Sequence, residues 1–188
     1  TLLASSAASD VYKRQMLHIE KFEVNMLQEN CYVVSDETRE CVIIDCGAFY
    51  PEERTAIVNY IKENNLQPVH LLVTHGHLDH NFGNNTIHET FGLKPEVSAA
   101  DESLMKNLKQ QAEVFYQMQL DYDFPPVGHF FEENEVIRFG NHQFEIILTP
   151  GHSRGSVTFY CVDEKVAFTG DTLSVSYTHL TLPTKLEV

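Results

Sequence analysis

Residues 74–80 read Thr-His-Gly-His-Leu-Asp-His, which gathers four potential metal ligands in one short segment: His75, His77, Asp79 and His80. Imidazole nitrogens and carboxylate oxygens are the ligands that a borderline divalent cation prefers. In an extended chain His75 and His77 project to the same side, so both imidazoles can reach one ion. A single tetrahedral ion seldom takes four ligands from so short a segment, and the spacing therefore favours two neighbouring ions.

The chain around this segment predicts a strand on one side and a helix on the other. The apolar run His70–Val73 is typical of a short buried strand, and Gly76 ends it abruptly. A helix is expected to begin near Asp79, which would place the carboxylate at the positive end of the helix dipole. A longer amphipathic helix is predicted over Asp101–Leu120.

Short strand-like runs lie on both sides of this helix-rich middle. A helix is also predicted from Pro51 to Asn64, because proline is tolerated in a first helical turn and apolar residues then recur at helical spacing. Strands are predicted at Ile19–Val24, Cys31–Val34, Cys41–Ile44, Glu135–Arg138, Gln143–Leu148, Ser156–Cys161 and Lys165–Phe168. This order indicates an α+β fold in which two sheets pack together with helices outside.

Three further ligand candidates stand at predicted strand ends. His152 follows Pro150-Gly151 at the end of an apolar run, Asp171 follows Gly170, and Asp45 ends the run before Gly47. Proline and glycine force a sharp exit from a strand, and loops on a rigid scaffold commonly carry functional side chains. We therefore expect these residues to converge on the 74–80 segment.

In chain order, four motifs resemble those of the metallo-β-lactamase superfamily: Asp45-x-Gly47, His75-x-His77-x-Asp79-His80, His152 in Pro-Gly-His, and Asp171 in Gly-Asp-Thr. The resemblance covers nearly all of Met16–Leu173. The sequence is most similar to the glyoxalase II-like branch, which has a Thr-His-x-His-x-Asp-His signature and a Thr-Pro-Gly-His turn. The resemblance implies an αββα fold, a β-sandwich with flanking helices.

The resemblance also implies a role for each candidate residue. It divides the ligands into two sets, with a first ion held by His75, His77 and His152 and a second held by Asp79, His80 and a bridging Asp171. Asp45 would orient ligand histidines by hydrogen bonding. Water activated as hydroxide by the metal would be the nucleophile, and Asp79 would orient it and relay a proton. One or two Zn²⁺ ions are expected, with iron or manganese as alternatives.

The function implied by the resemblance is metal-dependent hydrolysis of thioesters of the S-lactoylglutathione type. Two alternatives stay open: an iron-dependent persulfide dioxygenase, which uses two histidines and one carboxylate, and a metal-binding fragment with impaired catalysis. Arg154 is expected either to hold an anionic group of a small-molecule substrate or to form a surface ion pair. Phe115, Tyr116 and Met118 either line the mouth of the site or pack in the core.

The two ends of the chain do not fit this pattern. Residues 5–15 and the stretch from about 175 to 184 resemble translated sequencing-adaptor text. We therefore expect a non-native leader over residues 1–15, an incomplete domain over residues 16–174 and a non-native tail over residues 175–188. The superfamily's last histidine ligand is expected further downstream, and His179 in the tail does not match its context. The sequence therefore predicts that only the first metal site is complete.

Composition limits the remaining possibilities. With 188 residues, 43% of them hydrophobic and 21% charged, the chain fits one soluble domain. Its net charge of -14 would repel nucleic acid and anionic membrane surfaces, and it lacks the run of roughly 18 apolar residues that a membrane span needs. The four cysteines have no Cys-x-x-Cys spacing and are expected as reduced core residues of a cytoplasmic protein. The oligomeric state stays open.

Overall fold

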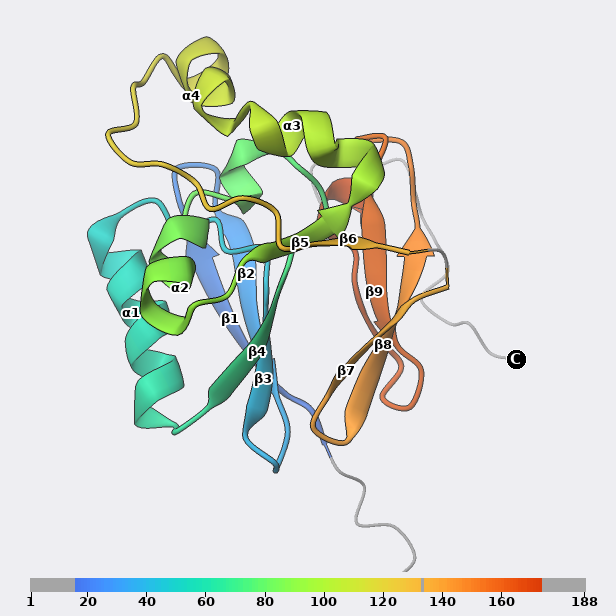
Figure 1. Ribbon diagram of the computed structural model, residues 1–188. Coiled ribbons are helices and arrows are strands. Elements are labelled where there is room, and N and C mark those ends of the chain that lie inside the picture. The colour runs from blue at the N-terminus through green and yellow to red at the C-terminus, as the bar shows by residue number, and fades with distance from the viewer. Residues whose placement is uncertain (1–15, 133, 174–188) are drawn as a thin grey trace, which may run out of the picture.

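Two β-sheets packed face to face form the centre of the computed structural model, which describes residues 16–132 and 134–173 (Figure 1). The first sheet has the strand order β1-β2-β3-β4-β5-β6. Its strands are β1 (His18–Val24), β2 (Glu29–Ser35), β3 (Glu40–Ile44), β4 (Gln67–Leu72), β5 (Pro95–Ser98) and β6 (His129–Phe131). The first three strands pair antiparallel, and β3 to β6 run parallel to one another.

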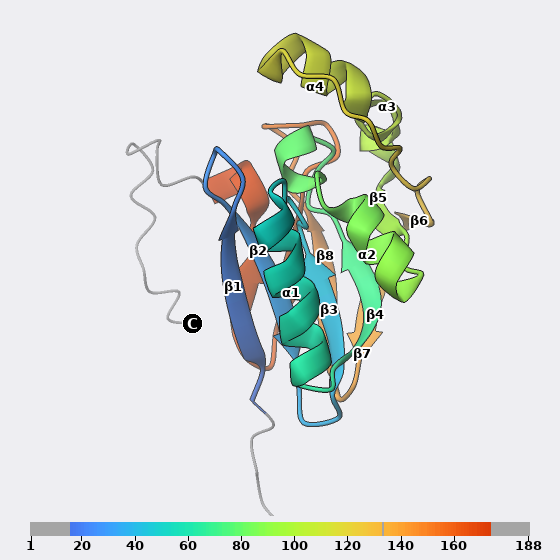
Figure 2. The same cartoon turned by 90° about the vertical axis from the view of Figure 1, so that its left-hand side faces the viewer.

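The second sheet is antiparallel and has the order β10-β9-β8-β7. Its strands are β7 (Val136–Phe139), β8 (His142–Leu148), β9 (Val157–Cys161) and β10 (Val166–Phe168). Helices α1 (Pro51–Glu63) and α2 (Asn84–Phe91) cover the outer face of the first sheet, as the two views at right angles show (Figures 1 and 2). This arrangement confirms the predicted sandwich with flanking helices.

Strand β3 shows how the sequence builds two layers of core from one strand. Successive side chains of a strand point to opposite faces. Cys41 and Ile43 accordingly pack in the cluster beneath α1, while Val42 and Ile44 pack in the cluster between the two sheets. All four side chains are fully buried, which explains why the run is continuously apolar and does not alternate with polar residues.

Two predicted helices differ from the structure. The helix expected near Asp79 is only the 3₁₀ turn η2 (Leu78–His80), and α2 begins later, at Asn84. The Asn81 side chain donates to the backbone carbonyls of His77 and His75, which competes with helical hydrogen bonding at this point.

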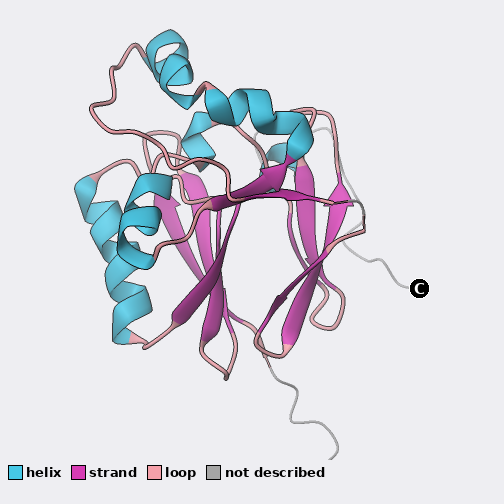
Figure 3. Ribbon diagram, in the orientation of Figure 1, coloured by secondary structure: helices cyan, strands magenta, loops and turns pink. Residues whose placement is uncertain are grey.

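The single helix predicted over residues 101–120 is also wrong, because this segment forms three short elements. They are the 3₁₀ turn η3 (Ala99–Asp101), α3 (Glu102–Lys106) and α4 (Leu108–Tyr116). Asn107 separates the two helices with a non-helical backbone, and its side chain donates to the Ser103 carbonyl at 2.8 Å. The last turn ends at Gln117, which has a left-handed φ of 53°. The two helices lie across one end of the sandwich (Figure 3).

The loops that carry the candidate ligands lie at this same end of the molecule. The carboxyl ends of the parallel strands β3, β4 and β5 meet at one sheet edge, as they must in a parallel arrangement. The end of β8 and the end of β10, which leads into the 3₁₀ turn η4 (Gly170–Leu173), approach it from the second sheet (Figure 1).

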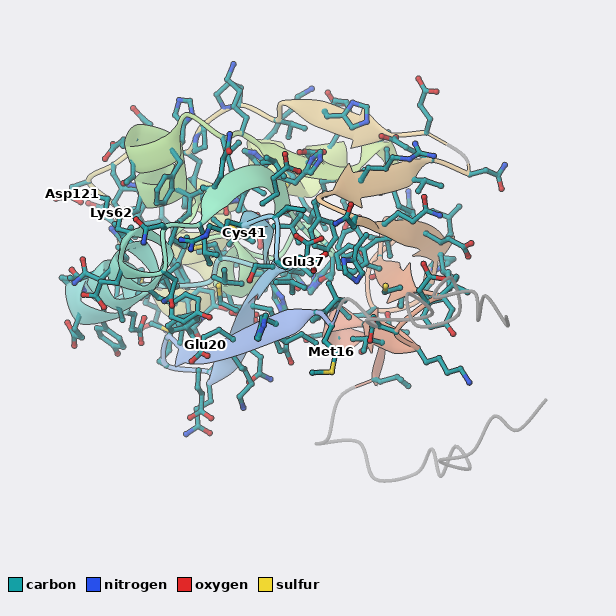
Figure 4. The ribbon with its side chains drawn as sticks, turned by 90° about the horizontal axis from the view of Figure 1, so that it is seen from below. Met16, Glu20, Glu37, Cys41, Lys62 and Asp121 are labelled. Atoms are coloured by element: carbon teal, nitrogen blue, oxygen red, sulfur yellow. The ribbon has the colours of Figure 1, made fainter. Side chains whose placement is uncertain are left out.

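At the opposite end, the sheets are joined by hydrogen bonds between two turns. Asp36, after β2, accepts bonds from the Asn141 backbone at 2.7 Å and from the His142 ring at 3.0 Å. Glu37 accepts a further bond from the Asn141 side chain at 2.9 Å. Figure 4, seen from below, labels Glu37 in this region between the sheets.

The remaining predictions concern cysteines, membrane spans and the chain ends. All four cysteines are buried and free. Within residues 16–132 and 134–173, no helix has the length and apolar character required to cross a bilayer. The predicted leader, the predicted tail and His179 lie outside the described residues.

Candidate metal centre

Three histidines from two loops form the first cluster of ligand atoms. His75 and His77 lie in the loop after β4, and His152 lies in the loop between β8 and β9. Nε2 of His75 is 3.1 Å from Nδ1 of His77, which is in turn 2.8 Å from Nε2 of His152. The structure therefore brings the first predicted ligand set together from both sheets.

A second cluster shares His75 with the first. Nε2 of His80 lies 3.3 Å from Oδ1 of Asp171, and Oδ2 of the same carboxylate lies 3.4 Å from Nε2 of His152. Asp171 thus stands between His80 of the second cluster and His152 of the first, and its role as a bridging ligand stays a prediction. Asp79 is close by, with Oδ2 3.7 Å from Nε2 of His80.

Asp45 holds the start of the 74–80 loop and faces His80. Its two oxygens accept hydrogen bonds from the backbone and the hydroxyl of Thr74, both at 2.7 Å. Oδ2 also lies 3.1 Å from Nδ1 of His80, on the side of the ring that points away from Asp171. Asp45 has a left-handed φ of 51°, so the end of β3 bends to aim this carboxylate. These contacts place the Asp45 carboxylate against the His80 ring, and its role in orienting a ligand stays a prediction.

Burial sets the charge state of the first cluster. Burial, together with the nearby His80 and His77 rings, lowers the pKa of His75 to about 2. Burial and His152 also lower the pKa of His77. Both rings are therefore neutral at neutral pH, the form in which imidazole offers a lone pair to a metal.

Nearby carboxylates set the charge state of His80 in the second cluster. Burial disfavours the charged form of His80, but Asp45, Asp171 and Glu29 outweigh it and raise the pKa of His80 well above its usual range. The hydrogen bond with His80 holds the pKa of Asp171 at about 2. The ionised carboxylate favours a cation at this position.

Close backbone packing fixes the positions of Asp79 and Asp171. A Cβ added to Gly47 would lie 2.0 Å from the backbone carbonyl oxygen of Asp79. The Asn25 side chain donates to the backbone carbonyls of Gly47 and Asp79, each at 2.9 Å. Gly170 has a left-handed φ of 49°, and a Cβ there would lie 2.3 Å from Oγ1 of Thr74. Glycine is therefore required at both turns by contact distance.

Sequence reasoning missed several buried polar residues around the centre. Glu29 is buried with both carboxylate oxygens lacking a hydrogen-bond partner, and its Oε1 lies 3.6 Å from Nδ1 of His80. Asp101 is buried between the two ligand loops. Gln111 accepts from the Leu78 backbone and donates to the Gly76 carbonyl, each at 3.0 Å. None of them belongs to a short ligand motif in the sequence.

The donor set fits a divalent metal ion. Among the described residues, three groups have all their ligand atoms within 4.8 Å of one another: His75–His77–His152, His75–His80–Asp171 and Glu29–Asp45–His80. All three residues of the last group are buried, and its two carboxylates lie on the Nδ1 side of His80. Nitrogen and oxygen donors of this kind suit zinc, iron and manganese alike.

A cavity of about 670 Å³ adjoins the first cluster. His77 and His152 line it together with Leu104 from α3, and Arg154 contributes a cationic side chain. Within the part of the chain that the structure describes, Arg154 has no hydrogen bond or ion pair, so the predicted alternative of a surface salt bridge is not formed there. A second cavity of about 510 Å³, between α3, α4 and residues 123–130, contains none of the candidate ligands.

The three aromatic and apolar candidates near the mouth divide between surface and core. Tyr116 packs edge-on against Phe82 with ring centroids 5.6 Å apart. Burial, with Asp79 and Asp171 nearby, raises the pKa of Tyr116 to about 12. Tyr116 and Met118 both pack against the buried apolar cluster that contains Phe82, whereas the Phe115 side chain is 72% exposed.

Comparison with known proteins gives a consistent set of relatives. Residues 24–184 match the family described as the metallo-β-lactamase superfamily. The chain is 35% identical over 158 residues to the hydroxyacylglutathione hydrolase GloC of Haemophilus influenzae, covering 84% of this chain and 72% of that protein. It is 32% identical over 157 residues to a hydroxyacylglutathione hydrolase of Chelativorans sp., covering 84% of this chain but only 52% of that protein. The chain thus spans about half the length of some curated relatives that it matches.

Solved structures share the fold. The B3 metallo-β-lactamase BLEG-1 superposes with a TM-score of 0.73 at 25% identity, covering 84% of this chain and 73% of that one. TTHA1623, solved in a di-iron-bound form, superposes with a TM-score of 0.67 at 27% identity, covering 80% and 70% of the two chains.

Proposed function

Because the chain belongs to the metallo-β-lactamase superfamily, we propose that it is a metal-dependent hydrolase of thioesters of the S-lactoylglutathione type. The observation that carries the proposal is the convergence of His75, His77 and His152 from two sheets beside a cavity of about 670 Å³. Two hydroxyacylglutathione hydrolases among the relatives support the choice of thioester.

We propose the division of ligands that the resemblance implies. His75, His77 and His152 would hold one ion, and His80 with Asp171 and Asp79 would hold another. When bound, such ions act as Lewis acids and lower the pKa of a coordinated water toward about 7. Zinc is the expected metal, with iron or manganese as alternatives.

The chain's own residues would position the water and the substrate. The Asp79 carboxylate, whose backbone is fixed by Asn25, would orient the attacking water and accept its proton. Attack on the carbonyl carbon would break the C–S bond, and Asp79 would pass the proton it took from the water to the leaving sulfur, which yields a carboxylic acid and a thiol. Arg154, at the cavity wall, would meet a negatively charged group of the substrate.

A second candidate function is supported by one observation. His75, His80 and Asp171 form a group of two histidines and one carboxylate, the ligand type of non-haem iron oxygenases. The relative TTHA1623 has been solved with two irons. An iron-dependent persulfide dioxygenase therefore stays the alternative.

The test is thiol release from S-lactoylglutathione by the chain loaded separately with zinc, manganese or iron. We expect metal-dependent turnover that falls by more than about 100-fold in His77→Ala, because a direct ligand matters at least as much as its supporting residues. The matched control is His18→Ala, which changes an exposed histidine on β1. Stoichiometric metal binding without thiol release would contradict the proposal. Oxygen uptake with glutathione persulfide would favour the dioxygenase.

A further inference from the structure

Asp101 lies between two loops that bring candidate ligands from different sheets. It ends η3, directly after β5 of the first sheet, and is only 1% exposed. The loop at residues 75–80 follows β4 of the same sheet, whereas the loop at residues 149–156 joins β8 to β9 of the second sheet. Its position makes Asp101 a potential link between the two halves of the centre.

Both carboxylate oxygens of Asp101 accept hydrogen bonds from these loops. Oδ2 accepts from the backbone N–H of Gly76 at 2.9 Å and from the hydroxyl of Ser153 at 2.6 Å. Oδ1 accepts from the backbone N–H of Gly155 at 2.7 Å. Hydrogen bonds to an ionised carboxylate are shorter and stronger than bonds between neutral groups. One side chain thus binds both loops at once.

The donors are immediate neighbours of the candidate ligands. Gly76 stands between His75 and His77 in the sequence, and Ser153 directly follows His152. A shift of either donor would therefore move a ligand ring by a similar distance. Nδ1 of His77 and Nε2 of His152 lie 2.8 Å apart, and they belong to different loops.

The packing around Asp101 shows that both loops approach it closely. A Cβ on Gly155 would lie 2.6 Å from Cγ of Asp101, and a Cβ on Gly76 would lie 3.4 Å from Cβ of Asp101. Over residues 16–132 and 134–173, the Asp101 carboxylate makes no ion pair. Its charge is compensated by the three hydrogen-bond donors, as a buried charge requires.

We propose that Asp101 is a positioning residue that fixes the 75–80 loop against the 149–156 loop and thereby sets the separation of His77 from His152 at the first ion. The proposal rests on the proposed metal-dependent function. The substitution Asp101→Asn keeps the size of the side chain but turns one acceptor into a donor that faces other donors. At least one hydrogen bond from Asp101 to the loops is then lost, and the separation of the His77 and His152 rings is no longer fixed.

The experiment measures metal affinity in the full chain, independently of turnover. Metal-free Asp101→Asn and Ser153→Ala are titrated with Zn²⁺ in competition with a chromophoric chelator, and the absorption spectrum of the Co²⁺ form reports coordination geometry. The matched control is Glu102→Gln, which neutralises the adjacent carboxylate, partly exposed and paired with Lys106 on the surface. We expect the first ion to bind about 10–100-fold more weakly in Asp101→Asn than in the unsubstituted chain, and the Co²⁺ spectrum to change. In the control Glu102→Gln, we expect the metal affinity to stay unchanged.

The outcomes separate positioning from a structural role. A merely structural residue would lower the unfolding temperature and leave metal affinity unchanged, so unaltered affinity and spectrum in Asp101→Asn would overturn the proposal. If Asp101→Asn does not fold, Ser153→Ala decides, because it removes one donor and keeps the carboxylate. Affinity equal to that of the unsubstituted chain would then overturn the proposal. Failure of the unsubstituted chain to bind metal would overturn the proposed function as well.

Discussion

A single backbone torsion at Gly170 controls where Asp171 points. Its φ is 49°, and an added Cβ would lie 2.3 Å from Oγ1 of Thr74, which is itself bonded to Asp45. We predict that Gly170→Ala displaces Asp171 and weakens binding of the second ion by more than about tenfold, as loss of a supporting residue does. Metal stoichiometry after equilibrium dialysis measures the effect.

The control for this prediction is Gly92→Ala. Gly92 has a comparable φ of 77° at the end of α2, but an added Cβ there would meet nothing within 4 Å. We expect this variant to lose about 1–2 kcal/mol of stability from the left-handed conformation alone and to keep its metal affinity. Equal metal affinity in the two variants would show that the contact with Thr74 does not position Asp171.

Arg154 provides a test of how the cavity selects its substrate. The side chain lines the cavity next to His77 and His152 and has no ion pair or hydrogen bond among the described residues. We predict that Arg154→Gln raises KM for S-lactoylglutathione about tenfold and leaves kcat nearly unchanged, because it removes a charged contact that is equal in ground and transition states. An uncharged thioester of the same acid should show no change in KM.

The control here is Arg138→Gln, which removes an exposed arginine from β7, away from the cavity. An equal rise of KM for the charged and uncharged thioesters in Arg154→Gln would count against an anion-binding role.

At the residue scale, sequence reasoning located all the residues of the two groups that share His75, because those residues occur in short motifs at strand ends, but it missed Glu29 of the third group. As metal ligands they stay predictions. Asp101 could not be found in this way, since its partners lie 25, 52 and 54 positions away. A lone aspartate before a helix is ordinarily interpreted as a cap.

The hydrogen bonds that join the β2–β3 turn to the β7–β8 turn predict a pH dependence of stability. Although burial opposes ionisation, hydrogen bonds from Thr38, Asn141 and His142 outweigh it and lower the pKa of Asp36. A depressed pKa in the folded state means that this stability is present above the unfolded value of about 3.9. It is lost as the pH falls through the folded pKa.

We therefore expect Asp36→Asn to lose about 1–3 kcal/mol at pH 7, because it leaves the donors of Thr38, Asn141 and the buried His142 without their charged acceptor. Urea unfolding of both proteins from about pH 6 down to about pH 2 should show the difference shrinking as the pH falls below the unfolded pKa of about 3.9. A constant difference over this range would show that the charge of Asp36 contributes nothing.

At the element scale, apolar runs bounded by turn residues predicted most of the strands, and helical spacing predicted α1. Helix α1 and strands β1, β2, β3, β7, β8, β9 and β10 are confirmed within a few residues of the predicted bounds. The pattern predicts neither β5, which has four residues and begins with proline, nor β6, which has three. Strands β7 and β10 are as short but were predicted, whereas β5 and β6 are parallel strands whose place depends on their neighbours in the sheet. Strand β4 also begins earlier than predicted, at Gln67.

For the molecule as a whole, metal binding is expected to join the two sheets. His77 lies in the loop after β4 of the first sheet, and His152 lies in the loop between β8 and β9 of the second sheet. An ion held by both histidines would therefore link the two sheets. At a free metal concentration one hundred times Kd, ligand binding to the folded state contributes about 2.7 kcal/mol. For a domain of this size, that corresponds to a rise in Tm of roughly 5–10 °C.

Calorimetry of the chain with zinc and with excess chelator measures this difference. The variant His77→Ala should show a much smaller shift between the two conditions, because it lacks one of the ligand candidates that link the sheets. Identical Tm values with zinc and with chelator in the unsubstituted chain would contradict the prediction.

Each sheet is drawn from one continuous stretch of chain, β1 to β6 and then β7 to β10, and the candidate ligands divide in the same way. A backbone break between β6 and β7 would leave each piece with an unfinished ligand set. Expressed as two separate polypeptides, the pieces could rebuild the centre only by associating, and the cation would favour the associated form by mass action. The topology thus lends itself to a split reporter whose reassembly measures free metal in solution.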